Sequence, residues 1–271
     1  SMLDRKLIVG ASDAMTASVC SRHPKVDYVW ASSLIMSGML GLEDTGIVKI
    51  ERFLSLISGI IKGSKKPVIL DLDIGGRNPR ELRKNLGLLK RLDLGGICIE
   101  DEGWPKVNAL LENNKRKIIG PQKMSTKIKL AKKVLGRKTL VIARTHSIIV
   151  NEPLSVLQKR VDYYTEAGAD ILCLHYTGKS WGCFRTIIKK LKLNKPLLLI
   201  LSRSDTIPTG LSNVKFQYIL FPNQIYRAML YAAIPSQTNK QIYQYNFNFK
   251  NGRIITVQKL LEIIRKIHAK S

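Results

Sequence analysis

Eight short apolar runs recur along the chain of 271 residues, and segments long enough to form helices separate them. Each run has the length expected of a buried strand. The eight runs are Lys6–Gly10, Tyr28–Ala31, Val68–Leu72, Gly96–Ile99, Leu140–Ala143, Ile171–Leu174, Leu197–Leu201 and Tyr218–Phe221. Strands that alternate with helices pair in parallel, so eight such units predict a (β/α)8 barrel of the TIM type. An open, doubly wound sheet is the alternative, although no GxGxxG motif follows the first run.

Helical periodicity marks five of the spacers, which are Ile50–Ile61, Pro79–Leu92, Pro153–Ala167, Ser180–Leu193 and Ile225–Ala233. Asn78 and Pro79 are typical of a helix start, because asparagine caps free backbone amides and proline fits the first turn. The polar and basic segment 113–126 contains Gly120 followed by proline, and we expect it to be a mobile loop.

A last amphipathic segment, Val257 to His268, follows the eighth unit. We expect a single domain over residues 1–271. Within it, residues 255–271 would form a C-terminal helix that covers the end of the barrel or packs on a neighbouring subunit.

The formal charge of +25 is unusual and raises the question of a nucleic-acid partner. The basic residues are spread along the chain, and aromatic residues, at 7%, are not interleaved with them. No stacking platform is therefore visible, and we do not expect nucleic acid to bind. Solvated, lysine-rich helix faces are the simplest interpretation of the charge, and a positive field that attracts a small anionic substrate is the second.

The four cysteines include no CxxC pair, and Cys98 and Cys173 lie inside strand-like runs. Reduced core thiols are the simplest interpretation, and they favour a reducing compartment. We find no signal peptide and no apolar run of membrane-spanning length. The sequence therefore predicts a cytoplasmic protein without a membrane segment.

Carboxylates follow the third and fourth apolar runs. Asp71 and Asp73 close the third run, and Glu100 closes the fourth. The carboxyl ends of neighbouring parallel strands meet at one edge, so we expect these acids to converge on a Mg²⁺ ion. The alternative is that one aspartate caps the next helix and the other pairs with Arg77.

Basic and small polar residues follow other runs. Arg144 and His175 close the fifth and sixth runs, where an arginine can hold a phosphoryl or carboxyl group and a histidine can donate to an anionic oxygen. The segment Trp30-Ala31-Ser32-Ser33-Leu34 follows the second run and offers hydroxyls and amides to an anion. Asp44 lies in a turn that, taken alone, carries no functional signal.

Taken together, these segments resemble the phosphoenolpyruvate mutases of the isocitrate lyase/phosphoenolpyruvate mutase superfamily. The resemblance extends over nearly the whole chain. It comprises Trp30–Leu34, Leu40–Asp44, Leu70–Gly75, Ile99–Asp101, Pro105–Asn108, Ala143–Arg144, Glu166–His175 and Thr238–Tyr243.

The resemblance implies a Mg²⁺ site at Asp71, Asp73 and Glu100. It also implies that the segment Trp30-Ala31-Ser32-Ser33-Leu34 binds the substrate, with the Ser32 and Ser33 amides on its carboxylate. The substrate would be a small anionic 2-oxo acid or a phosphonate. Members of the family form tetramers, so a homotetramer or a dimer is expected.

The resemblance implies catalytic roles for five residues. Arg144 and His175 would hold the phosphoryl and enolate oxygens, and Asp44 would lie beside the migrating phosphoryl group. Lys106 and Asn108 would lie on a gating loop that closes over the substrate. The reaction moves the phosphoryl group between the enol oxygen and C3, and water must be excluded during the transfer.

The carbon–carbon lyases of the superfamily carry a Lys-x-Cys-Gly-His run on this loop, whereas no cysteine occurs here between residues 101 and 137. This favours phosphoryl chemistry. A phosphonopyruvate hydrolase or another 2-oxo acid hydrolase or lyase is the alternative.

Three departures from the mutase pattern are Glu102 for lysine, Ala109 for serine and His146 for glutamate. They leave open an altered substrate, lost activity or a nucleic-acid-binding scaffold.

Overall fold

The computed structural model describes residues 5–46, 49–107, 116–178, 180–203, 206–211, 214–233 and residue 258. Its eight strands are β1 (Lys6–Ala11), β2 (Val26–Ala31), β3 (Val68–Asp71), β4 (Gly96–Glu100), β5 (Leu140–Thr145), β6 (Ile171–Leu174), β7 (Leu198–Ile200) and β8 (Tyr218–Phe221). All neighbouring strands pair in parallel, in the order β6-β5-β4-β3-β2-β1-β8-β7. A bridge between Leu172 and Leu197 joins the two edges. The predicted (β/α)8 barrel is confirmed, and the open doubly wound sheet is wrong.

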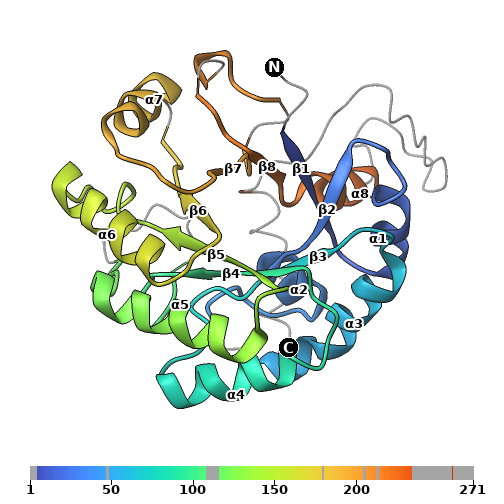
Figure 1. Cartoon of the computed structure of the whole chain (residues 1–271). Coiled ribbons are helices and arrows are strands. Elements are labelled where there is room, and N and C mark those ends of the chain that lie inside the picture. The colour runs from blue at the N-terminus through green and yellow to red at the C-terminus, as the bar shows by residue number, and fades with distance from the viewer. Residues whose placement is uncertain are drawn as a thin grey trace.

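Helices surround the strands, as Figure 1 shows in a view along the barrel. The α-helices are α1 (Ala14–Cys20), α2 (Ser33–Met39), α3 (Leu54–Gly63), α4 (Pro79–Leu89), α5 (Pro121–Leu135), α6 (Leu154–Glu166), α7 (Trp181–Lys190) and α8 (Gln224–Ala233). The 3₁₀ helices are η2 (Ile50–Phe53) and η3 (Thr209–Leu211). All five predicted helical spacers contain a helix.

The strands are buried on both faces, which explains their continuous apolar sequences. In β3, Ile69 belongs to a cluster inside the barrel, and Leu70 belongs to the larger cluster between strands and helices. Both side chains are 0% exposed. This alternation between two apolar surroundings leaves polar residues only at the strand ends, where they can form a site.

Local signals explain two helix boundaries. The Asn78 side chain accepts a hydrogen bond of 2.9 Å from the Glu81 amide, and Pro79 occupies the first turn of α4, as predicted. Gly168, with a φ of 93°, follows α6 at a position where the left-handed backbone favours glycine.

Two expectations differ from the structure, and a third falls outside the described residues. The predicted loop 113–126 is wrong from Pro121 onward, because α5 begins there; residues 113–115 lie outside the described residues. Between β7 and β8, the described residues form only the short helix η3. The predicted C-terminal helix of residues 255–271 lies outside the described part of the chain, apart from residue 258.

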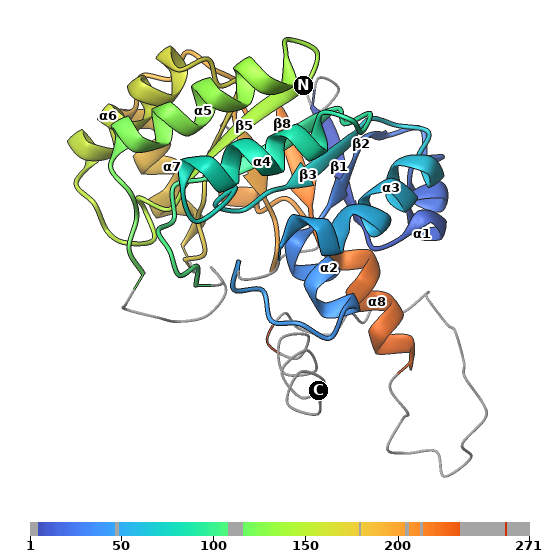
Figure 2. The ribbon, with the colours of Figure 1, turned by 90° about the horizontal axis from the view of Figure 1, so that it is seen from below.

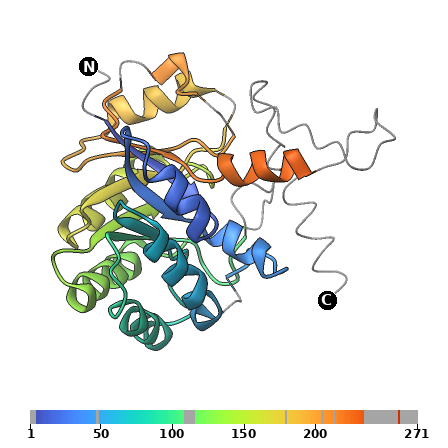
Figure 3. The same cartoon turned by 90° about the vertical axis from the view of Figure 1, so that its right-hand side faces the viewer.

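Helix α8 extends away from the barrel, at the same end as α2 (Figures 2 and 3). Met229 and Tyr231 on α8 are 42% and 40% exposed. A search of the described residues finds no helix with the length and apolar character needed to cross a membrane.

Candidate active site

A pocket lies at the carboxyl ends of the strands, the end at which TIM barrels hold their active sites. Acidic, basic, histidine and small polar side chains meet there among apolar ones. The residues that line it are Trp30, Ser32, Ser33, Leu34, Asp71, Asp73, Glu100, Glu102, Lys106, Arg144, His146, His175, Ile200, Ser202, Leu220, Pro222 and Asn223. Nearly all the predicted site residues that fall within the described chain therefore line one cavity.

Strand ends and one unusual backbone conformation bring three carboxylates together. Asp71 ends β3 and Glu100 ends β4, and pairing of these strands places both at one edge. Asp73 follows β3 with a φ of 51°, in the left-handed region that aspartate tolerates better than most residues. The Ser33 hydroxyl donates to Asp73 Oδ1 at 2.8 Å and lies 3.4 Å from Asp71 Oδ2. The two aspartates thus reach the same point although the strand ends before Asp73.

Arg144, on β5, lies among these carboxylates. Its Nη2 atom is 3.3 Å from Asp71 Oδ1 and 3.6 Å from Asp73 Oδ1, and it also binds Glu100 Oε2. Burial alone would raise the pKa of Glu100, but Arg144 and Lys106 outweigh it and lower that pKa. At the two aspartates burial dominates, so the pKa of Asp71 is raised and the pKa of Asp73 is raised well above its usual value. The site therefore favours additional positive charge.

Lys106 enters the pocket from the segment that follows β4. Its Nζ atom lies 2.7 Å from Asp44 Oδ1 and 2.7 Å from Asp73 Oδ1, and the residue is 6% exposed. Burial would lower the pKa of Lys106, but the two carboxylates outweigh it and raise that pKa. The ammonium group therefore stays charged and connects the loop that carries Asp44 to the end of β3.

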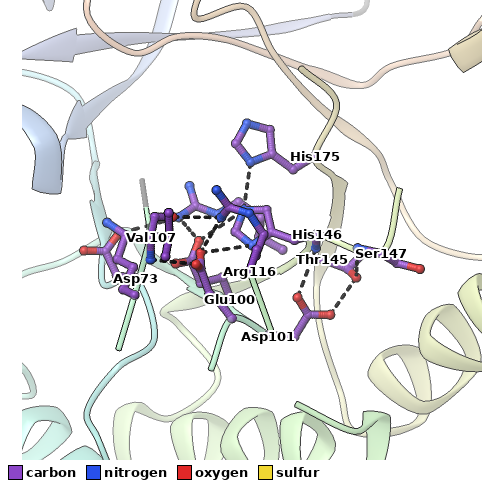
Figure 4. Close-up of polar contacts among 12 residues, drawn as sticks. Asp73, Glu100, Asp101, Val107, Arg116, Thr145, His146, Ser147 and His175 are labelled. Atoms are coloured by element: carbon purple, nitrogen blue, oxygen red, sulfur yellow. Dashed lines mark hydrogen bonds and ion pairs between the residues drawn. The ribbon is translucent and has the colours of Figure 1, made fainter. Parts of the chain in front are cut away.

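Two neutral histidines occupy the other side of the pocket. His146 follows β5, His175 follows β6, and His146 Nε2 lies 3.0 Å from His175 Nδ1 (Figure 4). Burial is the largest cause that lowers the pKa of both rings well below the usual value. A neutral His175 can donate to, or accept from, a ligand without adding charge.

Glu102, which departs from the family pattern, is paired within the protein. Its Oε2 atom accepts a hydrogen bond of 2.7 Å from Arg116 Nη1, and its Oε1 atom accepts one of 2.7 Å from the Val107 amide. Burial and the charge of Glu100 raise the pKa of Glu102 to about 7. The reversed charge at this position is thus compensated by Arg116, which sequence reasoning missed because the two residues lie on opposite sides of a loop.

Asp101 points away from the pocket, toward the helices (Figure 4). Its carboxylate accepts hydrogen bonds from Thr145 Oγ1 at 2.6 Å, the His146 amide at 3.0 Å, Tyr164 OH at 2.7 Å and Arg160 Nη1 at 3.3 Å. Thr145 ends β5 and His146 follows it, whereas Arg160 and Tyr164 lie on α6, so this carboxylate connects the barrel to its helical layer. Asp101 is therefore structural, although it is adjacent to Glu100.

The charges at the pocket favour a divalent cation. Among the described residues, the five carboxylates of Asp44, Asp71, Asp73, Glu100 and Glu102 contact the three cationic side chains of Lys106, Arg116 and Arg144. Within the described part of the chain, the buried Glu100 Oε1 has no hydrogen-bond partner. Glu100, Glu102 and His146 also place possible ligand atoms within 4.8 Å of one another. The donors therefore fit a metal ion, and carboxylate oxygens favour a hard one.

The family model described as phosphoenolpyruvate phosphomutase matches residues 4–242. The chain belongs to the phosphoenolpyruvate phosphomutase family. Enzymes of the superfamily generally depend on a divalent metal, which agrees with the acidic pocket described above.

Relatives of this phosphomutase-family chain differ in activity. A phosphoenolpyruvate phosphomutase from Tetrahymena pyriformis is 25% identical over 243 residues, which cover 89% of this chain and 80% of that protein. A 2-methylisocitrate lyase from Halalkalibacterium halodurans is 28% identical over 219 residues, which cover 79% and 70%. Sequence identity therefore establishes an enzyme superfamily without deciding between a mutase and a lyase.

Solved structures agree on the fold of the family. A phosphoenolpyruvate phosphomutase from Streptomyces platensis subsp. rosaceus matches with a TM-score of 0.78 and 22% identity over 98% of this chain and 92% of its own. A phosphonopyruvate hydrolase in complex with oxalate and Mg²⁺ matches with a TM-score of 0.72 and 17% identity over the same shares.

One predicted site residue within the described chain, Asp44, does not line the cavity, although its Oδ1 atom lies 2.7 Å from Nζ of Lys106, which does. Asn108, which was also predicted, lies outside the described residues. The structure adds Ser202 and Asn223, which follow β7 and β8. Their only sequence signal was their place just after a predicted strand.

Proposed function

We propose that the protein is a Mg²⁺-dependent mutase that interconverts phosphoenolpyruvate and phosphonopyruvate. One observation carries the proposal. A single atom, Arg144 Nη2, lies within 3.6 Å of carboxylate oxygens from Asp71, Asp73 and Glu100. Three clustered acids that can share one positive charge fit an ion-binding centre, and membership of the phosphoenolpyruvate phosphomutase family supports phosphoryl transfer as the reaction.

In this proposal Asp71, Asp73 and Glu100 hold the ion, directly or through water. Bound Mg²⁺ would supply a Lewis acid for the carboxylate and enol oxygens of the substrate. The Ser32 and Ser33 amides would hold the substrate carboxylate. Trp30 and Leu34 also line the pocket and would exclude water from the substrate.

The basic residues would stabilise the phosphoryl group during transfer. The bond between phosphorus and the enol oxygen breaks, and a bond between phosphorus and C3 forms. Arg144 would present a planar guanidinium to the phosphoryl oxygens. Neutral His175 can donate a hydrogen bond to the same group without adding charge. Lys106 would offset the developing charge while Asp44 orients its ammonium group.

Exclusion of water separates a mutase from a hydrolase, because water would capture the loosely bound phosphoryl group. Lys106, Arg144 and His175 are all buried. The segment after Lys106 lacks the cysteine that the superfamily's lyases use, since none occurs between residues 101 and 137. This supports phosphoryl transfer over carbon–carbon cleavage.

The test is ³¹P NMR of the protein with Mg²⁺ and phosphonopyruvate. Conversion to phosphoenolpyruvate supports the proposal, and the Asp71→Asn variant is the matched control that should be inactive. Release of inorganic phosphate would instead assign the phosphonopyruvate hydrolase activity that one structural relative carries in its name. If the protein changes neither phosphonopyruvate nor, in a parallel assay, phosphoenolpyruvate, the mutase proposal is wrong. Salt-dependent binding to a generic duplex would then support the scaffold alternative.

A further inference from the structure

Residues 101–103, which follow β4, lie beside residues 117–119, which precede α5. Glu102 forms an antiparallel bridge with Ile118, and the Gly103 amide donates to the Lys117 carbonyl at 2.8 Å. The Ile119 amide donates to the Asp101 carbonyl, also at 2.8 Å. The base of this connection is therefore a short, hydrogen-bonded ladder.

The ladder is closed by contacts of the Glu102 and Arg116 side chains with each other and with the backbone of Val107. We call these three residues the loop-base clamp. Glu102 accepts from both the Val107 amide and Arg116 Nη1, at 2.7 Å each. Arg116 Nη1 also donates to the Val107 carbonyl at 2.8 Å. The Glu102 and Arg116 side chains are 1% and 2% exposed, so water does not compete for these contacts. Buried hydrogen bonds between charged groups are among the stronger ones in proteins.

Lys106 immediately precedes Val107, and its ammonium group reaches Asp44 and Asp73 at 2.7 Å. A lysine side chain has four rotatable bonds, so it can hold such a geometry only if its backbone is anchored. The clamp fixes both the amide and the carbonyl of the next residue. We propose that Glu102 and Arg116 are positioning residues that hold Lys106 in the pocket.

The competing role for Glu102 is metal binding, because its oxygens lie near Glu100 and His146. Both Glu102 oxygens, however, already accept short hydrogen bonds from the protein. In contrast, Glu100 keeps one oxygen without a hydrogen-bond partner among the residues that the structure describes. The observed contacts therefore favour anchoring of the loop base over ion binding by Glu102.

The experiment measures the accessibility of Lys106 by trace acetylation with acetic anhydride and peptide mass spectrometry, normalised to the exposed Lys6. In Glu102→Gln and Arg116→Met, we expect the acetylation rate of Lys106 to rise about tenfold, because the loop base opens more often. Arg116→Lys keeps a cation and should stay within about threefold of the parent. Lys84→Met removes a cation from the exposed pair with Glu51 and is the matched control, which should change nothing.

Unchanged acetylation of Lys106 in both Glu102→Gln and Arg116→Met would overturn the proposal. A lower affinity for Mg²⁺ in Glu102→Gln, with acetylation unchanged, would assign Glu102 to the ion instead. If Arg116→Met fails to fold, the nearly isosteric Glu102→Gln still decides the question.

The catalytic consequence of the clamp rests on the proposed function. Glu102→Gln should lower kcat with KM nearly unchanged, and the double variant with Lys106→Ala should be no slower than Lys106→Ala alone. Additive losses would contradict a role that acts through Lys106. If the parent shows no turnover, the mutase proposal fails, while the acetylation result still tests the clamp.

Discussion

Glu100 and Asp101 are adjacent in the chain and both are 0% exposed, yet their surroundings are opposite. Asp101 faces the helices and accepts hydrogen bonds from four donors of the protein. Glu100 faces the pocket, shares Arg144 with two aspartates and, among the described residues, leaves one oxygen without a hydrogen-bond partner. The difference separates a buried acid that stabilises the fold from one whose remaining binding capacity is available to a ligand.

The largest expected effect is on the affinity for Mg²⁺ of the pocket that Glu100 faces. Asp71→Asn should lower the affinity for Mg²⁺ by about 100-fold or more, because it removes one of three converging charges. Turnover should fall with it, while the free energy of unfolding in metal-free buffer should not decrease. Isothermal titration and urea denaturation measure the two effects. Binding of Mg²⁺ with the parent's affinity would show that the ligands are assigned wrongly.

The matching substitution on the other side is Asp101→Asn. It should lower the free energy of unfolding by about 3 kcal/mol, since four buried donors would lose an anionic acceptor, even though Arg160 keeps its ion pair with Glu152. Urea denaturation with and without Mg²⁺ should give the same loss. Glu51→Gln removes an exposed ion pair and should change stability by less than about 1 kcal/mol. If the loss of unfolding free energy in Asp101→Asn disappears when Mg²⁺ is added, Asp101 is not purely structural and its contrast with Glu100 is wrong.

Lys106 connects the pocket to a loop and should act mainly on turnover. Lys106→Ala should reduce kcat by about 100-fold and change KM only a few-fold, as expected of a group that acts in the transition state. Steady-state kinetics with phosphonopyruvate measure both constants. A raised KM with unchanged kcat would instead indicate a group that only binds the ground state.

Metal removal should give the smallest effect. Chelation of Mg²⁺ should lower the free energy of unfolding of the parent by about 1–3 kcal/mol, the range expected when an ion present well above its Kd binds only the native state. Thermal denaturation with and without a chelator measures this difference. Chelation should not change the free energy of unfolding of Asp71→Asn. In Asp101→Asn it should lower that free energy by as much as in the parent.

The eight strands could be predicted from the sequence to within about two residues at most ends, because burial on both faces produces unbroken apolar runs. The short helix α2 could not be predicted from the sequence. Six of its seven residues, Ser33 to Gly38, are buried, so it has no polar face and no amphipathic period. Helical periodicity predicts helices that lie between a core and solvent, and α2 is not one of them.

The candidate site was partly predictable for a similar reason. The predicted strand ends alone place Asp71, Glu100 and Arg144 at one edge, where the paired strands hold them. The contact between Glu102 and Arg116 joins residues 14 apart across a loop and follows no period, so only the structure reveals it. His146 stood out in the sequence solely as a departure from the family pattern.

The backbone at Asp73 has a consequence for the evolution of this barrel. A left-handed aspartate costs about 1–2 kcal/mol relative to the ordinary conformation, and glycine would remove that cost. Asp73→Gly should therefore offer a more stable protein that has lost a carboxylate from its pocket. An acid kept at this position would mark a lineage in which selection favours activity over robustness.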